Sequence, residues 1–296
     1  MPNVMSTESA IPICKPPDRN PRRPRLQVPP GATDCHVHVF GPSPRYPYSA
    51  QRGYTPPDST VDDLLFMHAQ LGIDRVVLTQ PSVYGTDNSA ILDAMATVPD
   101  RARAIVALPP TVGDDELVGL DRAGVRGIRL NLDNVGGMPM PLESVPEIAE
   151  RIADLGWHIE FLFPGGELVD LAPLLSALPV PVSVAHFAYM TLDVSSPPFK
   201  ELLRLVGEGQ LWVKLSAPNR VSAIDLPPYD DVAPLAHALV EANSDVLLWA
   251  TDWPHPNKFG DMPNDADLLE AFGEWITDEE LRNKILVDNP ARLYGF

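Results

Sequence analysis

The sequence has few cysteines, few basic residues and no long apolar run. Its two cysteines, Cys14 and Cys35, are too few for a disulfide-rich fold. No stretch reaches the roughly 18 consecutive apolar residues that cross a bilayer. The N-terminal residues also lack the apolar run of a secretory signal peptide. We therefore expect a cytoplasmic protein without a membrane span.

Basic residues are outnumbered by acidic ones, 22 to 40, which gives a formal net charge of −18. A protein that binds nucleic acid needs clustered Lys and Arg to neutralise phosphates. An acidic surface is also repelled by anionic membranes. We expect neither partner, and the sequence does not indicate an oligomeric state. A small anionic ligand is still compatible with this charge, because a few buried arginines can reverse its sign inside a pocket.

Residues 1–30 differ in composition from the rest of the chain. They contain eight prolines and carry a net charge of +3, so residues 31–296 carry −21. A Pro-rich polar segment cannot bury enough apolar area to fold alone. We expect an extended N-terminal arm over 1–30, either lying on the domain or free of it, and one domain over 31–296.

Short β-branched runs alternate with amphipathic segments whose apolar residues recur every three or four positions. The predicted strands are 33–40, 74–80, 103–110, 127–132, 158–163, 181–187, 211–216 and 245–253. Strands that alternate with helices pair in parallel through right-handed crossovers. Eight such units predict an α/β fold, a distorted (β/α)8 TIM barrel. An open doubly wound sheet usually has a Gly-rich turn after its first strand, and this sequence has none there.

Reactive side chains occur where several predicted strands end. The active site of a (β/α)8 barrel forms at the C-terminal ends of its strands. His36 and His38 share one face of the first strand, since they are two residues apart. His186 ends the sixth strand and Asp252 the eighth, which neighbours the first in a closed barrel. These four residues predict a catalytic cluster. His158 opens the fifth strand at the opposite end, so we expect it to be structural.

Longer motifs carry a resemblance to a known family. They are DCHVHVFGP (34–42), GVRGIRLN (124–131), TDWPHPN (251–257) and LVDNPARLYGF (286–296). The sequence resembles the amidohydrolase superfamily in its amidohydrolase-related branch, and within it the family of 2-pyrone-4,6-dicarboxylate lactonase and related lactonases. The resemblance extends from about residue 31 to the end of the chain.

The resemblance implies a hydrolase that opens the lactone of a small, anionic carboxylic acid, in the catabolism of aromatic compounds. It implies that Asp252 acts as general base on water and that His36, His38 and His186 polarise the carbonyl. Positions that hold the substrate in the family correspond to Tyr54, Ser82, Arg129, Arg220 and Asn257. Asn131 joins this set, because it lies two residues beyond Arg129 on the same strand face.

Three positions depart from the lactonase pattern. Tyr189 and the segment 133–137 stand where the dicarboxylate lactonase has arginines, and Leu162 stands near its tyrosine. Bidentate arginine contacts are a means by which pockets select carboxylates. We therefore expect the ester-cleaving residues to be retained and the substrate to differ.

The cofactor and the reaction type have alternatives. The fourth predicted strand has no lysine and the fifth does not end in a histidine, which are two ligands common in metal-dependent relatives. We expect no cofactor; the alternative is one divalent metal such as zinc on His36, His38 and Asp252. Metal-dependent lactone isomerisation or non-oxidative decarboxylation would suit the same residues. A non-catalytic binding protein is a further alternative.

Overall fold

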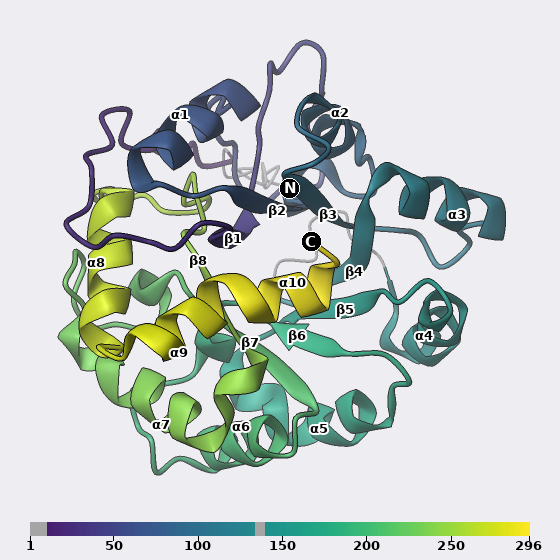
Figure 1. The fold of residues 1–296 in the computed structure, drawn as a ribbon. Helices are drawn as coiled ribbons and strands as arrows, with labels where there is room; N and C mark the ends of the chain where they lie inside the picture. Colours follow the sequence, from purple (N-terminus) through teal and green to yellow (C-terminus); the bar gives the residue numbers. More distant parts are fainter. Residues whose placement is uncertain (1–10, 134–139) are drawn as a thin grey trace, which may run out of the picture.

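The computed structural model describes residues 11–133 and 140–296. Within them, eight parallel strands form one sheet in the order β1 to β8, with helices around it (Figure 1). The strands are β1 (Thr33–Val37), β2 (Arg75–Thr79), β3 (Ala102–Val106), β4 (Val125–Asn131), β5 (His158–Leu162), β6 (Val182–Val184), β7 (Leu211–Ser216) and β8 (Leu247–Ala250). The predicted (β/α)8 barrel is therefore confirmed.

The helices follow the strands in alternation until β8, after which three helices end the chain. They are α1 (Val61–Leu71), α2 (Ser89–Thr97), α3 (Asp114–Ala123), α4 (Val145–Ala153), α5 (Leu168–Ala177), α6 (Pro197–Gly207), α7 (Ala233–Asn243), α8 (Asp265–Trp275), α9 (Glu279–Asn283) and α10 (Asn289–Tyr294). Local signals fix their ends: α1 begins with a capping box between Thr60 and Asp63 and ends at Gly72, whose φ is 81°. None of the described helices is long and apolar enough to cross a membrane.

Four predicted strands, 33–40, 103–110, 181–187 and 245–253, run at least three residues past the observed ends of β1, β3, β6 and β8. His38 therefore follows β1 directly instead of lying within it. His186 and Asp252 therefore follow their strands instead of ending them. Their φ angles are 56° and 65°, in the left-handed region, which cannot continue a strand. This local change of direction turns both side chains toward the barrel axis, where β1 ends.

Hydrogen bonds between the ends of β1 and β8 close the barrel at its mouth. The backbone N–H and the hydroxyl of Thr251 donate to the two carboxylate oxygens of Asp34, at 3.0 and 2.6 Å. The N–H of Asp252 donates to the carbonyl of His36 at 3.0 Å. Because of these contacts, Asp252 is fixed beside His36 and His38, as expected from the closed barrel.

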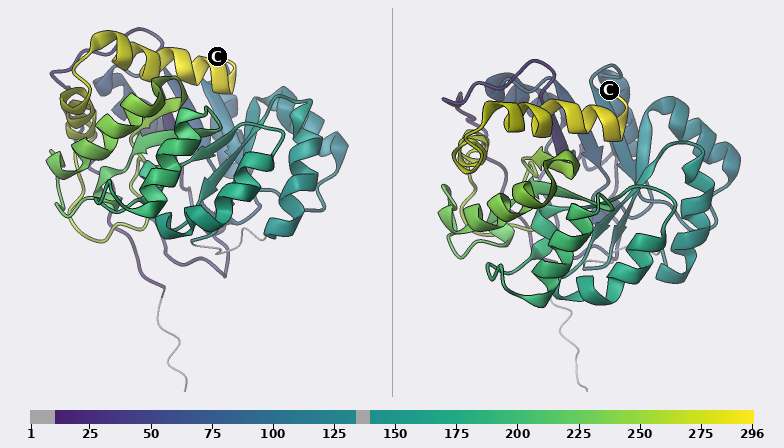
Figure 2. Two further views of the ribbon diagram at one scale, coloured as in Figure 1. Left: turned by 90° about the horizontal axis from the view of Figure 1, so that it is seen from below. Right: turned by 60° about the horizontal axis from the view of Figure 1, so that its bottom comes forward.

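Helix α10 covers the opposite end of the barrel: it lies in front of the sheet in Figure 1 and along the top of the barrel in the turned views of Figure 2. Its Tyr294 is fully buried and meets the ring of His158 edge-on, with centroids 5.3 Å apart. The Nδ1 of His158 is 2.7 Å from the carbonyl of Arg126, which agrees with a structural role. One end of the barrel is thus closed by packing, and the four predicted catalytic residues lie at the other end.

Two sequence predictions fall partly on residues that are not described. Residues 1–10 of the N-terminal arm and residues 134–137 of the segment that departs from the lactonase pattern lie outside the described ranges. The described part of the arm, 11–30, lies against the barrel near α1 and α8, where the purple trace runs in Figure 1.

Candidate active site

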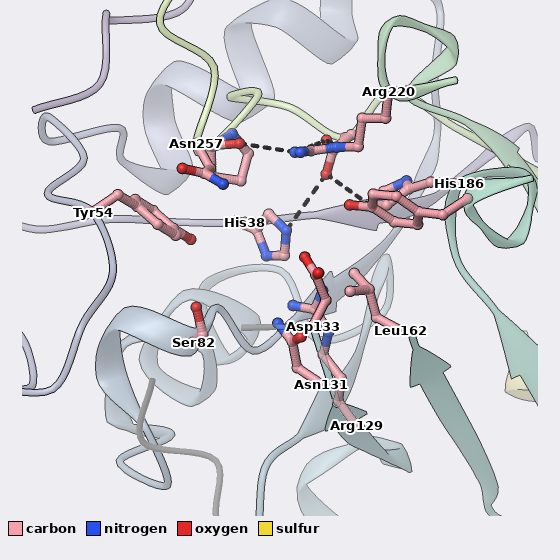
Figure 3. A pocket seen from close by; sticks show the side chains of 13 residues that line it. His38, Tyr54, Ser82, Arg129, Asn131, Asp133, Leu162, His186, Arg220 and Asn257 are labelled. Atoms are coloured by element: carbon pink, nitrogen blue, oxygen red, sulfur yellow. Dashed lines mark hydrogen bonds and ion pairs between the residues drawn. The ribbon is translucent and has the colours of Figure 1, made fainter. Parts of the chain in front are cut away.

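The four predicted catalytic residues come together at the mouth of the barrel, where Figure 3 labels His38 and His186. The Oδ1 atom of Asp252 lies 3.8 Å from Nε2 of His36, 3.6 Å from Nε2 of His38 and 3.5 Å from Nε2 of His186. All four side chains are buried. These distances are longer than a normal N–H···O hydrogen bond, so the imidazoles surround this oxygen without closing on it.

A left-handed turn positions His186. Four successive residues, His186 to Tyr189, have φ angles between 51° and 56°, and none of them is glycine. Such residues cost roughly 1–3 kcal/mol each and persist where the surrounding structure requires them. Gly165, in the loop after β5, makes room for the turn: a Cβ at this position would lie 2.4 Å from the carbonyl oxygen of Tyr189. The conformation that aims His186 therefore depends on a glycine in a neighbouring loop.

His38 presents a lone pair to the cluster. Its Nδ1 is 2.7 Å from the carbonyl oxygen of Thr79, which can only accept, so Nδ1 carries the proton. Burial lowers the pKa of His38 below its usual range, which keeps the ring neutral. The Nε2 atom is consequently an acceptor. His38 cannot donate a hydrogen bond to a substrate carbonyl in this state.

His186 and His36 have the opposite tautomer. The hydroxyl of Ser216 accepts from the backbone N–H of His186 at 3.2 Å. Its own proton has two acceptors within reach, Nδ1 of His186 at 2.9 Å and the carbonyl of Lys214 at 3.5 Å, and it is donated to the nearer one, Nδ1. The ammonium of Lys214 has three acceptors: Nδ1 of His36, the carbonyl of Cys35 and the carboxylate of Glu160. Burial lowers the pKa of His36 to about 3 and that of His186 well below its usual range. Both neutral rings therefore carry their proton on Nε2, facing Asp252.

Arg220 forms an ion pair with Asp252 at the edge of the cavity. Its Nη2 and Nε lie 2.7 and 3.1 Å from Oδ2 of Asp252, and Nη2 also donates to the carbonyl of Pro256. Burial alone would raise the pKa of Asp252, but the charge of Arg220 and the contacts with the histidines outweigh it. The pKa lies well below its ordinary value. Asp252 is therefore ionised, and the sequence had suggested a different partner for Arg220.

A small cavity of about 40 Å³ opens above the cluster. All six residues predicted to contact substrate line it: Tyr54, Ser82, Arg129, Asn131, Arg220 and Asn257. His38, His186 and Asp252 also line it, whereas His36 does not. In Figure 3, Tyr54 and Asn257 lie on one side of His38, and Leu162 lies on the other.

The positions that depart from the lactonase pattern also border the cavity. Tyr189 and Leu162 are in its wall, together with Asp133, the last described residue before the undescribed segment. The only guanidinium in the described wall besides Arg220 belongs to Arg129, whose Nη1 donates to the carbonyl of Gln80 at 2.7 Å. Arg129 is thus an arginine of the cavity wall that forms no ion pair with Asp252, the candidate general base.

Glu160, on β5, is a site residue that the sequence analysis missed. It is fully buried, and its Oε1 lies 3.4 Å from Nδ1 of His36 and 3.5 Å from Nε of Arg129. It also pairs with Lys214 inside the barrel. Burial would raise the pKa of Glu160, but the ammonium of Lys214 outweighs it and holds the pKa well below its usual range. The feature that could have revealed Glu160 in the sequence is a single acidic residue in the otherwise uncharged strand HIEFL. Every residue of this strand is buried.

The cluster includes a set of residues that could bind a metal. His36, His186 and Asp252 each offer one ligand atom, and these atoms lie within 4.8 Å of one another. This set has His186 where the sequence analysis placed His38. Within the described residues, His36 Nε2 and Asp252 Oδ1 have no hydrogen-bond partner. Coordination at Nε2 would require His36 and His186 to move their protons to Nδ1.

A comparison with protein families shows which family the chain belongs to. A family model described as amidohydrolase matches residues 33–296, which is most of the chain. The chain therefore belongs to the amidohydrolase family, and the resemblance inferred from its motifs is confirmed.

The sequence matches to related proteins cover nearly the whole chain. The 4-sulfomuconolactone hydrolase of Hydrogenophaga intermedia is 37% identical over 289 residues, covering 96% of this chain and 95% of that protein. The 2-pyrone-4,6-dicarboxylate hydrolase of Comamonas testosteroni is 38% identical over 285 residues, covering 93% of each. A crystal structure of a probable 2-pyrone-4,6-dicarboxylic acid hydrolase from Acinetobacter baumannii, with citric acid bound, superposes with a TM-score of 0.80. It is 28% identical and covers 90% of this chain and 100% of that one.

Proposed function

We propose that this chain hydrolyses the lactone ring of a small anionic carboxylic acid. The observation that carries the proposal is the ionised Oδ1 of Asp252, which faces three imidazoles beside a cavity that contains Arg129. The relatives named as lactone hydrolases support the same reaction class.

Asp252 and His38 orient the attacking water. Both Oδ1 of Asp252 and Nε2 of His38 are acceptors, and they are 3.6 Å apart at the cavity. A water that donates one proton to each presents its oxygen lone pair to the lactone carbonyl. As the new C–O bond forms, Asp252 takes the proton from that water. When the ring C–O bond breaks, the same proton passes to the leaving oxygen.

His186 stabilises the negative charge that develops on the carbonyl oxygen. It lines the cavity and carries its proton on Nε2, so it can donate to that oxygen. One such donor in a preorganised site contributes about 3 kcal/mol. His36 lies behind the wall, and its Nε2–H faces Asp252, which orients the carboxylate. The three histidines thus have three roles, where the sequence suggested one.

Substrate binding is assigned to the cavity wall. Arg129 binds the carboxylate, since a buried guanidinium offers two parallel donors to it. Tyr54, Ser82, Asn131 and Asn257 orient the ring by hydrogen bonding. Arg220 keeps Asp252 ionised and takes no carboxylate. A substrate with a single bound carboxylate fits this set.

We propose that the reaction proceeds without a metal, because Lys214 and Ser216 place the protons of His36 and His186 on the atoms that would bind it. If a divalent ion such as zinc occupied His36, His186 and Asp252, it would polarise the carbonyl. Dialysis against a chelator, followed by elemental analysis, separates the two states. We expect unchanged turnover; loss of activity that zinc restores would contradict the metal-free proposal.

The reaction class is tested with a panel of anionic and neutral lactones in ¹⁸O-labelled water. Hydrolysis places one labelled oxygen in the carboxylate of the product, whereas isomerisation and decarboxylation place none there. We expect labelled ring-opened acid from an anionic lactone. An unlabelled isomer, release of carbon dioxide or no turnover of any lactone would contradict the proposed function.

A further inference from the structure

The N-terminal arm is attached to α8 by a buried carboxylate. The guanidinium of Arg22 donates to both oxygens of Glu270, at 2.9 and 2.8 Å, and Arg25 donates to Oε2 at 2.9 Å. Only 9% of the Glu270 side chain is exposed. A Cβ at Gly273, one turn further along α8, would lie 2.7 Å from Leu26 of the arm. The helix surface therefore matches the arm closely, as expected of a permanent contact.

The preceding residues of the arm cross from α8 to α1 beside the loop that follows Asp252. Asn264, which caps α8, donates to Asp18 at 2.8 Å. Arg19 donates to Asp63 of α1 and to the carbonyl of Asp58, at 3.1 and 2.8 Å. Between these contacts the arm borders a small cavity shared with Trp253. The arm thus passes over the residue that comes directly after the general-base candidate.

The far end of the arm lies behind two residues of the cavity wall. Residues 12 to 14 pair with Thr55: the N–H of Cys14 donates to Thr55 at 2.9 Å, and the N–H of Thr55 donates to Pro12 at 2.8 Å. The Cys14 side chain is 5% exposed and packs in one cluster with Tyr54. Burial raises the pKa of the Cys14 thiol, and the nearby backbone N–H of Asn257 acts in the opposite direction. Tyr54 and Asn257 are both in the wall of the cavity.

We propose that the arm is part of the active site: residues 12–25 position Tyr54 and Asn257 and thereby set the affinity for substrate. Arg22 and Cys14 act as positioning residues, since neither lines the cavity. The effect on affinity rests on the proposed lactone hydrolysis. The positioning of Tyr54 and Asn257 is independent of the proposed reaction, because it concerns contacts within the protein without substrate. Detaching the arm loosens one side of the cavity and leaves Asp252 with its partners Arg220 and His186.

The test compares a double variant, R22M with R25M, to the matched control R23M. Arg23 lies between the two arginines, is exposed, and forms no salt bridge within the described residues. Hydrogen–deuterium exchange followed by mass spectrometry reports on the amides of Thr55 and Asn257. We expect faster exchange at both amides in the double variant and wild-type exchange in the control. If the amides of the arm exchange faster in the double variant while those of Thr55 and Asn257 exchange as in the wild type, the positioning role is overturned.

Kinetics of the same proteins test the effect on affinity. We expect KM to rise roughly tenfold in the double variant with kcat within about twofold, because orientation of the substrate is lost while the reacting groups stay in place. C14A, which keeps the arginine contacts, should raise KM in the same direction. A loss of melting temperature with unchanged KM would overturn the proposal. If the wild type cleaves no lactone, the proposed function fails, and the exchange experiment alone decides the role of the arm.

Discussion

The Nη2 and Nε atoms of Arg220 lie 2.7 and 3.1 Å from Oδ2 of Asp252, so one carboxylate oxygen is occupied and the other faces the histidines. This pair divides the carboxylate between two tasks. Oδ2 is held in an ion pair that keeps the group charged, and Oδ1 faces the imidazoles of three histidines.

R220M should lower kcat about 100-fold and change KM much less. Removing one partner of a buried ion pair leaves the other charge uncompensated, which costs about 3–5 kcal/mol, and the base would lose its fixed orientation. Steady-state kinetics on the best lactone measures both constants. A large increase in KM with unchanged kcat would instead assign Arg220 to substrate binding.

R129M should raise KM for an anionic lactone by roughly ten- to a hundredfold, since a charged hydrogen-bonded pair contributes about 1.5–3 kcal/mol. A neutral lactone of the same ring size is the internal control. Its KM should not change, because it offers no carboxylate to the guanidinium. An equal increase for both substrates would mean that Arg129 supports the wall and does not recognise charge.

G165A and its neighbour G166A form a matched pair. A Cβ at Gly165 would lie 2.4 Å from the backbone oxygen of Tyr189, whereas a Cβ at Gly166 has no atom within 4 Å. G165A should displace the turn that carries His186 and lower kcat at least roughly tenfold. G166A should behave as wild type. Equal kinetics in the two variants would show that the turn does not depend on this glycine.

The attachment of the arm should weaken in acid. Hydrogen bonds from Arg22 and then Arg25 hold the pKa of Glu270 below its usual value. A depressed folded-state pKa contributes stability that is complete above the unfolded value of about 4.3 and is lost as the pH falls toward the folded value. The difference in unfolding free energy between wild type and E270Q should therefore be larger at neutral pH than in acid. Urea denaturation at both pH values measures it, and a difference that grows in acid would contradict the assignment.

The strand pattern was sufficient to predict the barrel and the four residues that meet at its mouth. Side chains at strand ends must meet at one mouth of a parallel barrel, whatever the details of packing. The left-handed turn after His186 could not be predicted in the same way, because the segment HFAY contains no glycine. Its conformation is imposed by neighbours such as Gly165, which lies about 20 residues earlier in the sequence.

The roles of individual groups depend on partners that are far apart in the sequence. Glu160 and Lys214 resemble ordinary interior positions of their strands, and only the register across the barrel places them together behind His36. The same holds for Arg220, whose partner is Asp252. A sequence pattern indicates which residues belong to a site, but the closed sheet determines which of these residues are in contact.

In the proposed reaction Asp252 activates water to open a lactone, and the variant D252N removes this role alone. The amide keeps the size of the side chain but cannot accept the proton at Oδ1. On the lactone that the wild type cleaves best, kcat should fall by about 10²–10⁴-fold, the range expected for a general base, with the circular dichroism of the fold unchanged. A D252N enzyme that turns over within a few-fold of wild type would contradict the account.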